Sequence, residues 1–137
     1  MTTNQVHDQI RREIIESGRD TRYTIEAYLF VMSGLEFYLA RLGEKRHVSG
    51  QELSRGLLHF AHKQFGPLAA AVFKSWGVER TNDLGNIVYN LISIHVMSKQ
   101  PEDRLEDFSD VCDINEFFAG QKDYEIDKNF IKSIKGA

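Results

Sequence analysis

The chain is short of the residues that mark secreted, disordered or membrane proteins. It has one cysteine in 137 residues, which excludes an internal disulfide, and nothing in its composition indicates an oxidising compartment. Two prolines and ten glycines are too few for a low-complexity chain. No apolar run reaches the roughly 18 residues of a membrane-spanning helix, and the polar segment Met1–Arg12 does not look like a signal peptide. We therefore expect a cytoplasmic protein that makes no contact with a membrane.

Strong net charge is also missing. The formal charge is −3 at pH 7 and the isoelectric point is about 5.9, so the composition gives no reason to expect nucleic acid as a partner. Residues 99–137 contain ten acidic and six basic residues, whereas residues 1–98 contain ten acidic and eleven basic ones. The acidic character therefore belongs to the C-terminal part. With 42% hydrophobic residues, the chain can bury one core without disulfide or metal cross-links.

The stretch Leu84–Ser98 lacks Asp, Glu, Lys and Arg altogether. A surface helix normally carries charge on its polar face, so we expect this stretch to be the central, mostly buried helix of the domain. One broad face is apolar and includes His95, which we expect to be a neutral histidine of the core. The opposite face is a narrow polar stripe that continues from Asp83 to Ser93.

Apolar side chains recur at helical spacing through the rest of the chain and predict a mainly α, single-domain fold of about five main helices. The first expected helix ends at Gly18. Three more are expected before the central helix, over Thr24–Leu42, Ser49–Gln64 and Pro67–Trp76. Capping-box patterns at Ser49–Glu52 and Asp113–Glu116 each mark a helix start. Short helices are expected after Pro101, and Lys122–Asp127 could form a short strand pair with Lys45–Val48.

Several ordered motifs carry a resemblance to a known family. The motifs are Arg46–Leu53, Phe65–Leu68, Trp76-Gly77, Asp83–Leu91 and Asp103–Phe108. Together they resemble a bacterial family known as the planctomycete and verrucomicrobial conserved hypothetical proteins, over residues 23–118. The resemblance implies a bacterial intracellular domain, with 20–119 as the family-like core and 120–137 as a C-terminal extension. It carries over no activity, cofactor, partner or catalytic residue.

The polar stripe of the central helix is the first candidate site. Side-chain amides on a largely uncharged helix must find partners when they are buried. We favour bonds to a connecting loop that lock the fold, because loop backbone is always available to an Asn. The alternative is a small polar cleft that recognises a peptide or metabolite. Its residues would be Trp76, Arg80, Asp83, Asn86, Asn90 and Ser93.

A second candidate site lies at the helix start marked by Ser49. Arg46 and His47 precede this residue, and the free amides of a helix start favour anions. These groups could hold a phosphate or a carboxylate. The alternative, which we favour, is that Ser49 only caps its helix.

For the other reactive side chains we expect no catalytic or metal-binding role. His59 and His62 have a spacing compatible with a metal, but Arg55 lies between them on the helix face, so we expect solvated histidines and no metal. Acidic neighbours would raise the pKa of Cys112, which argues against a nucleophile. The carboxylates of Asp103–Asp113 lack the spacing of a calcium loop and form a solvated acidic face, or a docking surface for a basic partner. We expect no cofactor.

Three function classes remain open. Phe30 and Phe37 lie away from the main apolar face of their helix, and we favour packing within the domain over the alternative that they face a second subunit. We favour a non-catalytic interaction or regulatory module with an unknown protein partner, self-associating as a homodimer through these aromatic residues. The alternative is a small-molecule-binding protein or enzyme that uses the Asp83–Ser93 stripe. The third class, a helix–turn–helix nucleic-acid binder, is disfavoured because its recognition helix offers no cation beyond Arg80.

Overall fold

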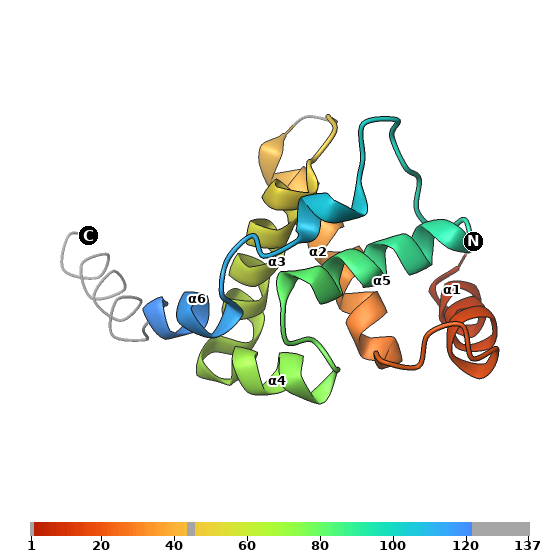
Figure 1. Ribbon diagram of the computed structural model, residues 1–137, viewed down its shortest axis with the longest axis horizontal. Helices are drawn as coiled ribbons and strands as arrows, with labels where there is room; N and C mark the ends of the chain where they lie inside the picture. Colours follow the sequence, from red (N-terminus) through yellow and green to blue (C-terminus); the bar gives the residue numbers. More distant parts are fainter. Residues whose placement is uncertain (1, 44–45, 122–137) are drawn as a thin grey trace.

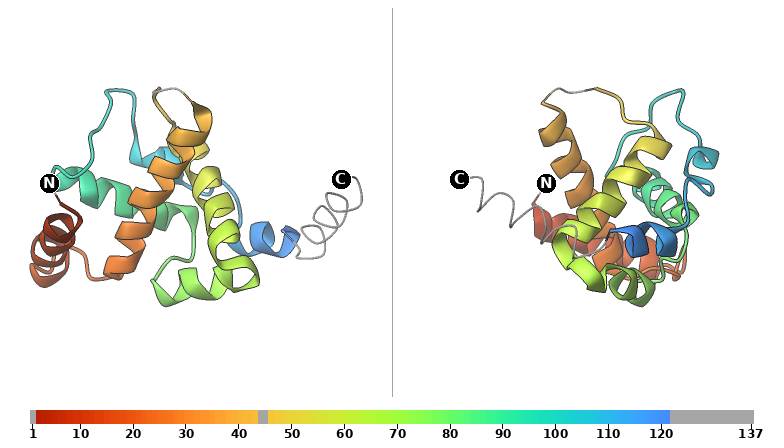
Figure 2. Two further views of the ribbon diagram at one scale, coloured as in Figure 1. Left: turned by 180° about the vertical axis from the view of Figure 1, so that it is seen from behind. Right: turned by 90° about the vertical axis from the view of Figure 1, so that its left-hand side faces the viewer.

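Helices α2 (Ile25–Leu42) and α3 (Gly50–Phe65) pack against each other and support the rest of the chain (Figure 1). The structure is a computed structural model that describes residues 2–43 and 46–121. Helix α5 (Thr81–Ser93) contacts both α2 and α3. It crosses in front of α2 in Figure 1 and behind α2 in the reversed view of Figure 2, so the two helices form successive layers.

The N-terminal helix packs at one end of this assembly. Helix α1 (Thr3–Ile10) continues directly into the π-helical turn η1 (Arg11–Glu16). Thr2 and Gln5 form a capping box at its start, and Ile10 and Ile14 are fully buried. Gly18 follows with φ of 76°, as expected for the residue that ends a helix. The amphipathic helix predicted up to Gly18 is confirmed in outline.

A short helix and a tight turn connect α3 to α5. After α3 come a 3-10 turn, η2 (Gly66–Leu68), and the short helix α4 (Ala69–Ser75). Gly77 then adopts φ of 90°, and a Cβ atom there would lie 2.2 Å from the carbonyl oxygen of Arg22. Only glycine allows this close approach between the α4–α5 turn and the segment before α2.

The acidic C-terminal part folds back over α5. It forms the 3-10 turn η3 (Leu105–Phe108) and the helix α6 (Ile114–Gly120), whose N-terminus is capped by Asp113. The buried hydroxyl of Thr81 donates to the Phe108 carbonyl over 2.7 Å and accepts from the Val111 amide over 3.0 Å. One side chain of α5 thus fixes the η3 segment on the core.

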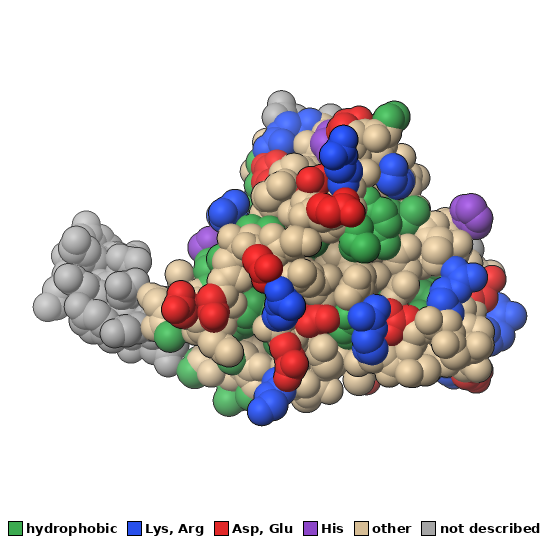
Figure 3. Space-filling view, in the orientation of Figure 1, with side chains coloured by type: hydrophobic (Ala, Val, Ile, Leu, Met, Phe, Trp, Pro, Cys, Tyr) green, Lys and Arg blue, Asp and Glu red, His purple; other side chains and the backbone are tan. Residues whose placement is uncertain are grey.

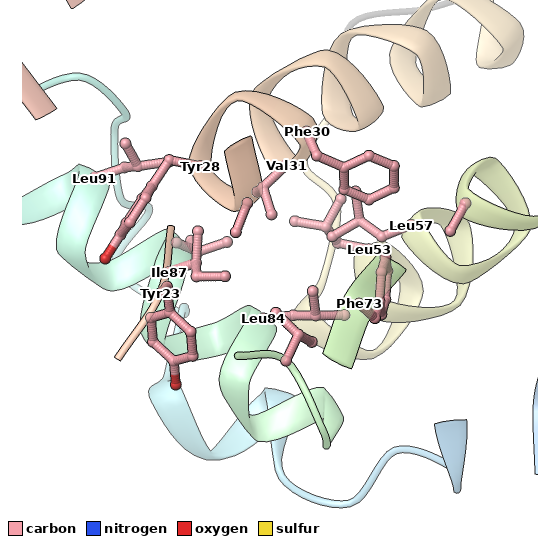
Figure 4. Close-up of a cluster of buried hydrophobic side chains, with 14 of the residues drawn as sticks. Tyr23, Tyr28, Phe30, Val31, Leu53, Leu57, Phe73, Leu84, Ile87 and Leu91 are labelled. Carbon is pink, nitrogen blue, oxygen red and sulfur yellow. The ribbon is translucent and has the colours of Figure 1, made fainter. Parts of the chain in front are cut away.

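The core lies where α2, α3, α4 and α5 meet. Figure 4 shows its side chains pointing toward one another, with the hydroxyl groups of Tyr23 and Tyr28 directed away from the apolar cluster. Tyr28, Leu57, Ile87 and Leu91 are completely buried. The largest aromatic group surrounds Phe30, whose ring centroid lies 5.2 Å from that of Phe60 and 5.5 Å from that of Phe73.

The mainly helical, compact fold predicted from the sequence is confirmed, with α5 at its centre. No strand occurs in residues 2–43 and 46–121. The predicted strand Lys122–Asp127 lies outside the described residues, as does the start of its expected partner, Lys45–Val48. In the same described part, none of the helices has the length and apolar character needed to cross a membrane.

The prediction for the end of the central helix was wrong. Helix α5 ends at Ser93 rather than Ser98, and His95 is exposed with φ of 64° instead of being part of the core. The amides of Val96 and Met97 both donate to the Leu91 carbonyl, over 2.9 Å and 3.3 Å. This turn brings the apolar side chains after His95 back against the core, so the same apolar pattern is satisfied without a helix.

Phe30 packs within the domain, as the favoured interpretation of the sequence predicts, and does not face a second subunit. Phe30 is buried among aromatic rings of its own chain. Phe37 is half-buried and stacks on Phe60 at 4.8 Å, with the cations of Arg41 and Lys63 over its ring. Packing on two sides of α2, which the sequence favoured over a subunit interface, therefore describes Phe30.

Candidate functional site

The first half of the polar stripe binds the segment that precedes α2. The Asp83 carboxylate accepts the Tyr23 hydroxyl over 2.5 Å and the backbone amides of Glu79 and Arg80 over 2.9 and 3.0 Å. Asn86 donates its side-chain amide to the same Tyr23 oxygen over 3.0 Å. Burial, together with the bond to Asp83, raises the pKa of Tyr23, so its hydroxyl stays protonated and donates. Asp83 therefore caps α5 and anchors Tyr23.

The second half of the stripe holds a buried carboxylate. Asn90 donates to Asp20 over 2.8 Å and to the Tyr28 hydroxyl over 3.0 Å. Arg22 meets both oxygens of Asp20, over 3.0 and 2.8 Å, and lowers the pKa of that carboxyl to about 2. Burial raises the pKa of Tyr28 to about 12. Ser93 accepts Arg19 over 2.6 Å. The stripe is thus covered and satisfied by the segment before α2.

The remaining two residues of this candidate site lie elsewhere. Trp76 packs with Phe30 and Phe73, and its carbonyl accepts the Thr24 amide over 3.3 Å. Arg80 reaches Asp110 over 2.5 Å on the exposed side of the α4–α5 turn. The side chains of Asp83, Asn86, Asn90 and Ser93 therefore all bond to residues 19–28, whereas the side chains of Trp76 and Arg80 contact other parts of the chain. Sequence reasoning missed the partners Asp20, Tyr23 and Tyr28, although an acid inside the connector 19–22 could have pointed to them.

A cleft of about 400 Å³ lies on the other side of α5. Its walls come from α2, α3, α5 and η3, and the turn after α5 adds Val96 and Met97. Figure 3 shows hydrophobic side chains gathered between η3 and the 94–104 segment, flanked by charged groups of both signs. A volume of this size and an apolar lining are typical of small-molecule sites. The principal apolar side chains of the walls are Leu35, Leu39, Leu53, Val88, Ile92 and Phe108.

The second candidate site forms the mouth of this cleft. Arg46 holds both oxygens of Glu52, over 3.0 and 2.5 Å, and Tyr38 donates to Glu52 over 2.6 Å. These bonds lower the pKa of Glu52 to about 2. His47 Nε2 lies 2.9 Å from Asp103 Oδ1 and joins the loop before α3 to the 94–104 segment. Ser49 caps α3 by accepting the Glu52 amide over 3.1 Å.

Because Arg46 and His47 are already paired with carboxylates, the second candidate site is less able to bind an anion than its sequence indicates. An anion at Arg46 would have to compete with the carboxylate of Glu52, and one at His47 would compete with Asp103. The favoured interpretation of Ser49 as a cap agrees with its bond to Glu52. The sequence located this part of the cleft but not its apolar interior, which needs side chains from four separate elements.

Tyr89 supplies a polar group to the cleft wall. Its ring lines the cleft, and its hydroxyl oxygen is buried without a hydrogen-bond partner among the described residues. Burial raises the pKa of Tyr89, and the nearby carboxylates of Asp103, Asp107 and Glu106 raise it further. A buried hydroxyl without a partner costs about 1–3 kcal/mol, so this group destabilises the cleft wall.

The histidine and cysteine side chains considered as reactive groups are surrounded by groups that give them no catalytic or metal-binding partner among the described residues. His59 is exposed and its ring lies 4.8 Å from that of Phe117. Across the described residues, no group of three His, Cys, Asp or Glu side chains could hold a metal ion. Burial is the main cause that raises the pKa of Cys112, ahead of the charge of Asp113, while Arg55 acts in the opposite direction. The expected direction of that pKa shift is confirmed.

Comparisons with protein-family models, curated proteins and solved structures return no match. The resemblance to the planctomycete and verrucomicrobial conserved hypothetical proteins therefore stays a prediction.

Proposed function

We propose that this protein is a cytoplasmic, non-catalytic binding domain whose ligand enters the cleft between α2, α3, α5 and η3. The observation that carries the proposal is the apolar cleft of about 400 Å³. Volumes of several hundred Å³ accommodate drug-sized ligands. The Asp83–Ser93 stripe was the alternative location for a small-molecule site, but its side chains are engaged with the segment before α2, in line with the structural role that the sequence favoured.

Binding rather than catalysis is favoured by the groups at the mouth of the cleft. His47 and Asp103 form an imidazole–carboxylate pair, which in an enzyme would need a nucleophile or substrate proton within hydrogen-bond reach. No hydroxyl or thiol of residues 2–43 and 46–121 forms a hydrogen bond with His47. The pair instead joins two chain segments across the mouth.

A nucleic-acid-binding role receives little support. Helix α5 would be the recognition helix, yet Leu84, Ile87 and Leu91 are buried and η3 covers one of its faces. Arg80, the cation at its start, is paired with Asp110. A recognition helix must enter the major groove with exposed side chains, which α5 does not offer.

A protein partner or a homodimer stays a prediction. Because Phe30 is buried, a self-association surface would depend on the half-buried Phe37 of α2 and on exposed apolar residues of other elements, such as Leu68 of η2. Light scattering at micromolar concentration separates the possibilities, because the ligand-binding proposal holds for a monomer whereas the homodimer requires a doubled mass.

The neutral fluorophore N-phenyl-1-naphthylamine tests the ligand-binding proposal. We expect saturable binding with one site per chain and a blue-shifted emission, because the fluorophore moves from water into an apolar cleft. Val96→Trp fills the cleft and should weaken binding by at least about tenfold. Leu68→Trp adds the same ring to an exposed residue outside the cleft and should leave binding unchanged.

The outcome is interpretable only for folded variants. Circular dichroism and the urea midpoint establish this, and Met97→Trp is the second cleft-filling variant should Val96→Trp be unstable. Absence of saturable binding to the wild-type chain, or equal affinity in the wild type and the folded cleft-filled variants, would overturn the proposal.

A further inference from the structure

The charged groups around the cleft are unequally neutralised. Its mouth carries Arg46, His47, Asp103, Arg104 and Asp107. The charge of Arg46 is balanced by Glu52, which it contacts through two hydrogen bonds. Arg104 is exposed, and its neighbours Glu102 and Glu106 are exposed acids. With His47 counted as neutral, two carboxylates of the mouth and two beside it therefore face Arg104, which forms no ion pair among the described residues.

The charges that act on Tyr89, in the wall of the cleft, also give a negative electrostatic potential there. Among the charges that act on the Tyr89 hydroxyl, those that shift its pKa belong to Asp103, Asp107 and Glu106, and all three raise it. The pKa of a phenol rises beside negative charge because the phenolate form is disfavoured. The same potential disfavours an anionic ligand group in the cleft and favours a cationic one.

We propose that the cleft selects small apolar molecules that carry a cationic head group, over neutral or anionic molecules with the same apolar tail. This inference rests on the proposed function and specifies the class of ligand. The apolar tail would lie against Leu53, Val88 and Ile92 in the interior, and the head group would remain at the mouth.

Asp107 is the carboxylate best placed to receive such a head group. It lines the cleft, and its Oδ2 atom accepts the Arg104 backbone amide over 3.2 Å. Its other oxygen has no hydrogen bond within the described residues, whereas both oxygens of Asp103 are engaged, with His47 and with the Gln100 amide. A primary ammonium has three donors and forms short, charge-assisted bonds to a carboxylate.

Competition between three probes with one tail tests the inference. Decylammonium, decanol and decanoate are each titrated against bound N-phenyl-1-naphthylamine at pH 7, low ionic strength and concentrations below micelle formation. We expect decylammonium to displace the fluorophore at a concentration at least about tenfold lower than decanoate, with decanol between them. Asp107→Asn, which can still accept the Arg104 amide, should reduce this ratio by at least about threefold.

Glu116→Gln provides the matched control, because it removes one exposed carboxylate on α6 that does not line the cleft. It should leave the decylammonium-to-decanoate ratio unchanged, and Asp103→Asn serves as the second variant at the mouth. A ratio near one or in favour of decanoate, or a ratio insensitive to both mouth variants, would overturn the inference while fluorophore binding still supported the proposed function. Failure of the fluorophore to bind would overturn both.

Discussion

The side-chain amide of Asn90 donates a hydrogen bond to the carboxylate of Asp20 over 2.8 Å, across 70 positions of sequence. Asp20 is 7% exposed, and it also accepts hydrogen bonds from the guanidinium and the backbone amide of Arg22. The bond therefore joins the central helix to the segment between η1 and α2 through a charge that has little contact with water. Burying a carboxylate is costly unless each of its oxygens is hydrogen-bonded, so this pair helps to determine the position of the N-terminal helix.

Asn90→Ala tests the contribution of this bond. The substitution removes the donor to Asp20 and to the Tyr28 hydroxyl, and both acceptors remain at least partly buried. We expect the free energy of unfolding to fall by about 2–3 kcal/mol, measured by urea titration of the Trp76 fluorescence. Asn115→Ala is the control, because Asn115 is exposed on α6 and should change stability by less than about 0.5 kcal/mol. Equal losses in the two variants would contradict the structural role.

The Asp20 carboxylate also predicts how stability depends on pH. Its pKa in the folded chain is about 2, below the ordinary value of 3.8. Ionised Asp20 therefore stabilises the fold above the ordinary pKa, and this contribution of about 2 kcal/mol is lost as the pH falls from about 5 to 2. The contribution of ionised Glu52 to stability is also lost as the pH falls, since the pKa of Glu52 is likewise lowered to about 2.

Comparison with Asp20→Asn separates the two carboxylates. Asn at position 20 carries no charge at any pH, so its variant should be less stable at pH 6 and should lose less stability on acidification. We expect the difference between wild type and variant to shrink by about 2 kcal/mol between pH 5 and pH 2, in urea titrations at constant ionic strength. Parallel stability curves across this range would show that Asp20 does not have the lowered pKa.

The positions of the helices could be predicted from sequence because they depend on local spacing. The caps at Ser49 and Asp113 and the glycines at 18 and 77 act within a few residues of their own helix ends. The end of α5 could not be predicted in this way. Ile94, Val96 and Met97 contact the core from a turn, and an apolar pattern of four residues cannot distinguish such a turn from one more helical turn.

The candidate sites were predictable only in part, for a related reason. Polar residues at helical spacing identified the stripe from Asp83 to Ser93, because a single helix supplies all of them. Its partners Asp20 and Tyr28 lie on other elements, and so does each wall of the cleft. Whether an amide faces a ligand or its own chain is decided by tertiary packing, which no spacing within one segment reports.

Thr81→Val tests the attachment of η3 to α5. The substitution keeps the volume and shape of the side chain but leaves the Phe108 carbonyl and the Val111 amide without the hydroxyl that satisfies them. We expect a loss of about 2–3 kcal/mol in urea unfolding, and weaker fluorophore binding because η3 forms one wall of the cleft. The control is Thr24→Val, since the Thr24 hydroxyl is buried without a partner among residues 2–43 and 46–121, and its removal should be neutral or stabilising. The opposite order of the two variants would contradict the hydrogen bonds assigned to Thr81.

Gly85→Ala tests the packing of η3 against α5. A Cβ atom at Gly85 would lie 2.6 Å from Cβ of Phe108, closer than atoms in a packed core allow. Alanine would gain up to about 1 kcal/mol of helix propensity in α5, but displacement of the buried Phe108 should cost more. We expect a net loss of about 1–2 kcal/mol in urea unfolding, and a lower affinity for N-phenyl-1-naphthylamine because Phe108 lines the cleft. A Cβ atom at Gly120 on α6 would meet no atom of the described residues within 4 Å, so Gly120→Ala should change neither measurement appreciably. A Gly85→Ala chain as stable as the wild type would mean that η3 moves away from α5 at little cost, and its affinity for the fluorophore would then show whether the cleft depends on that contact.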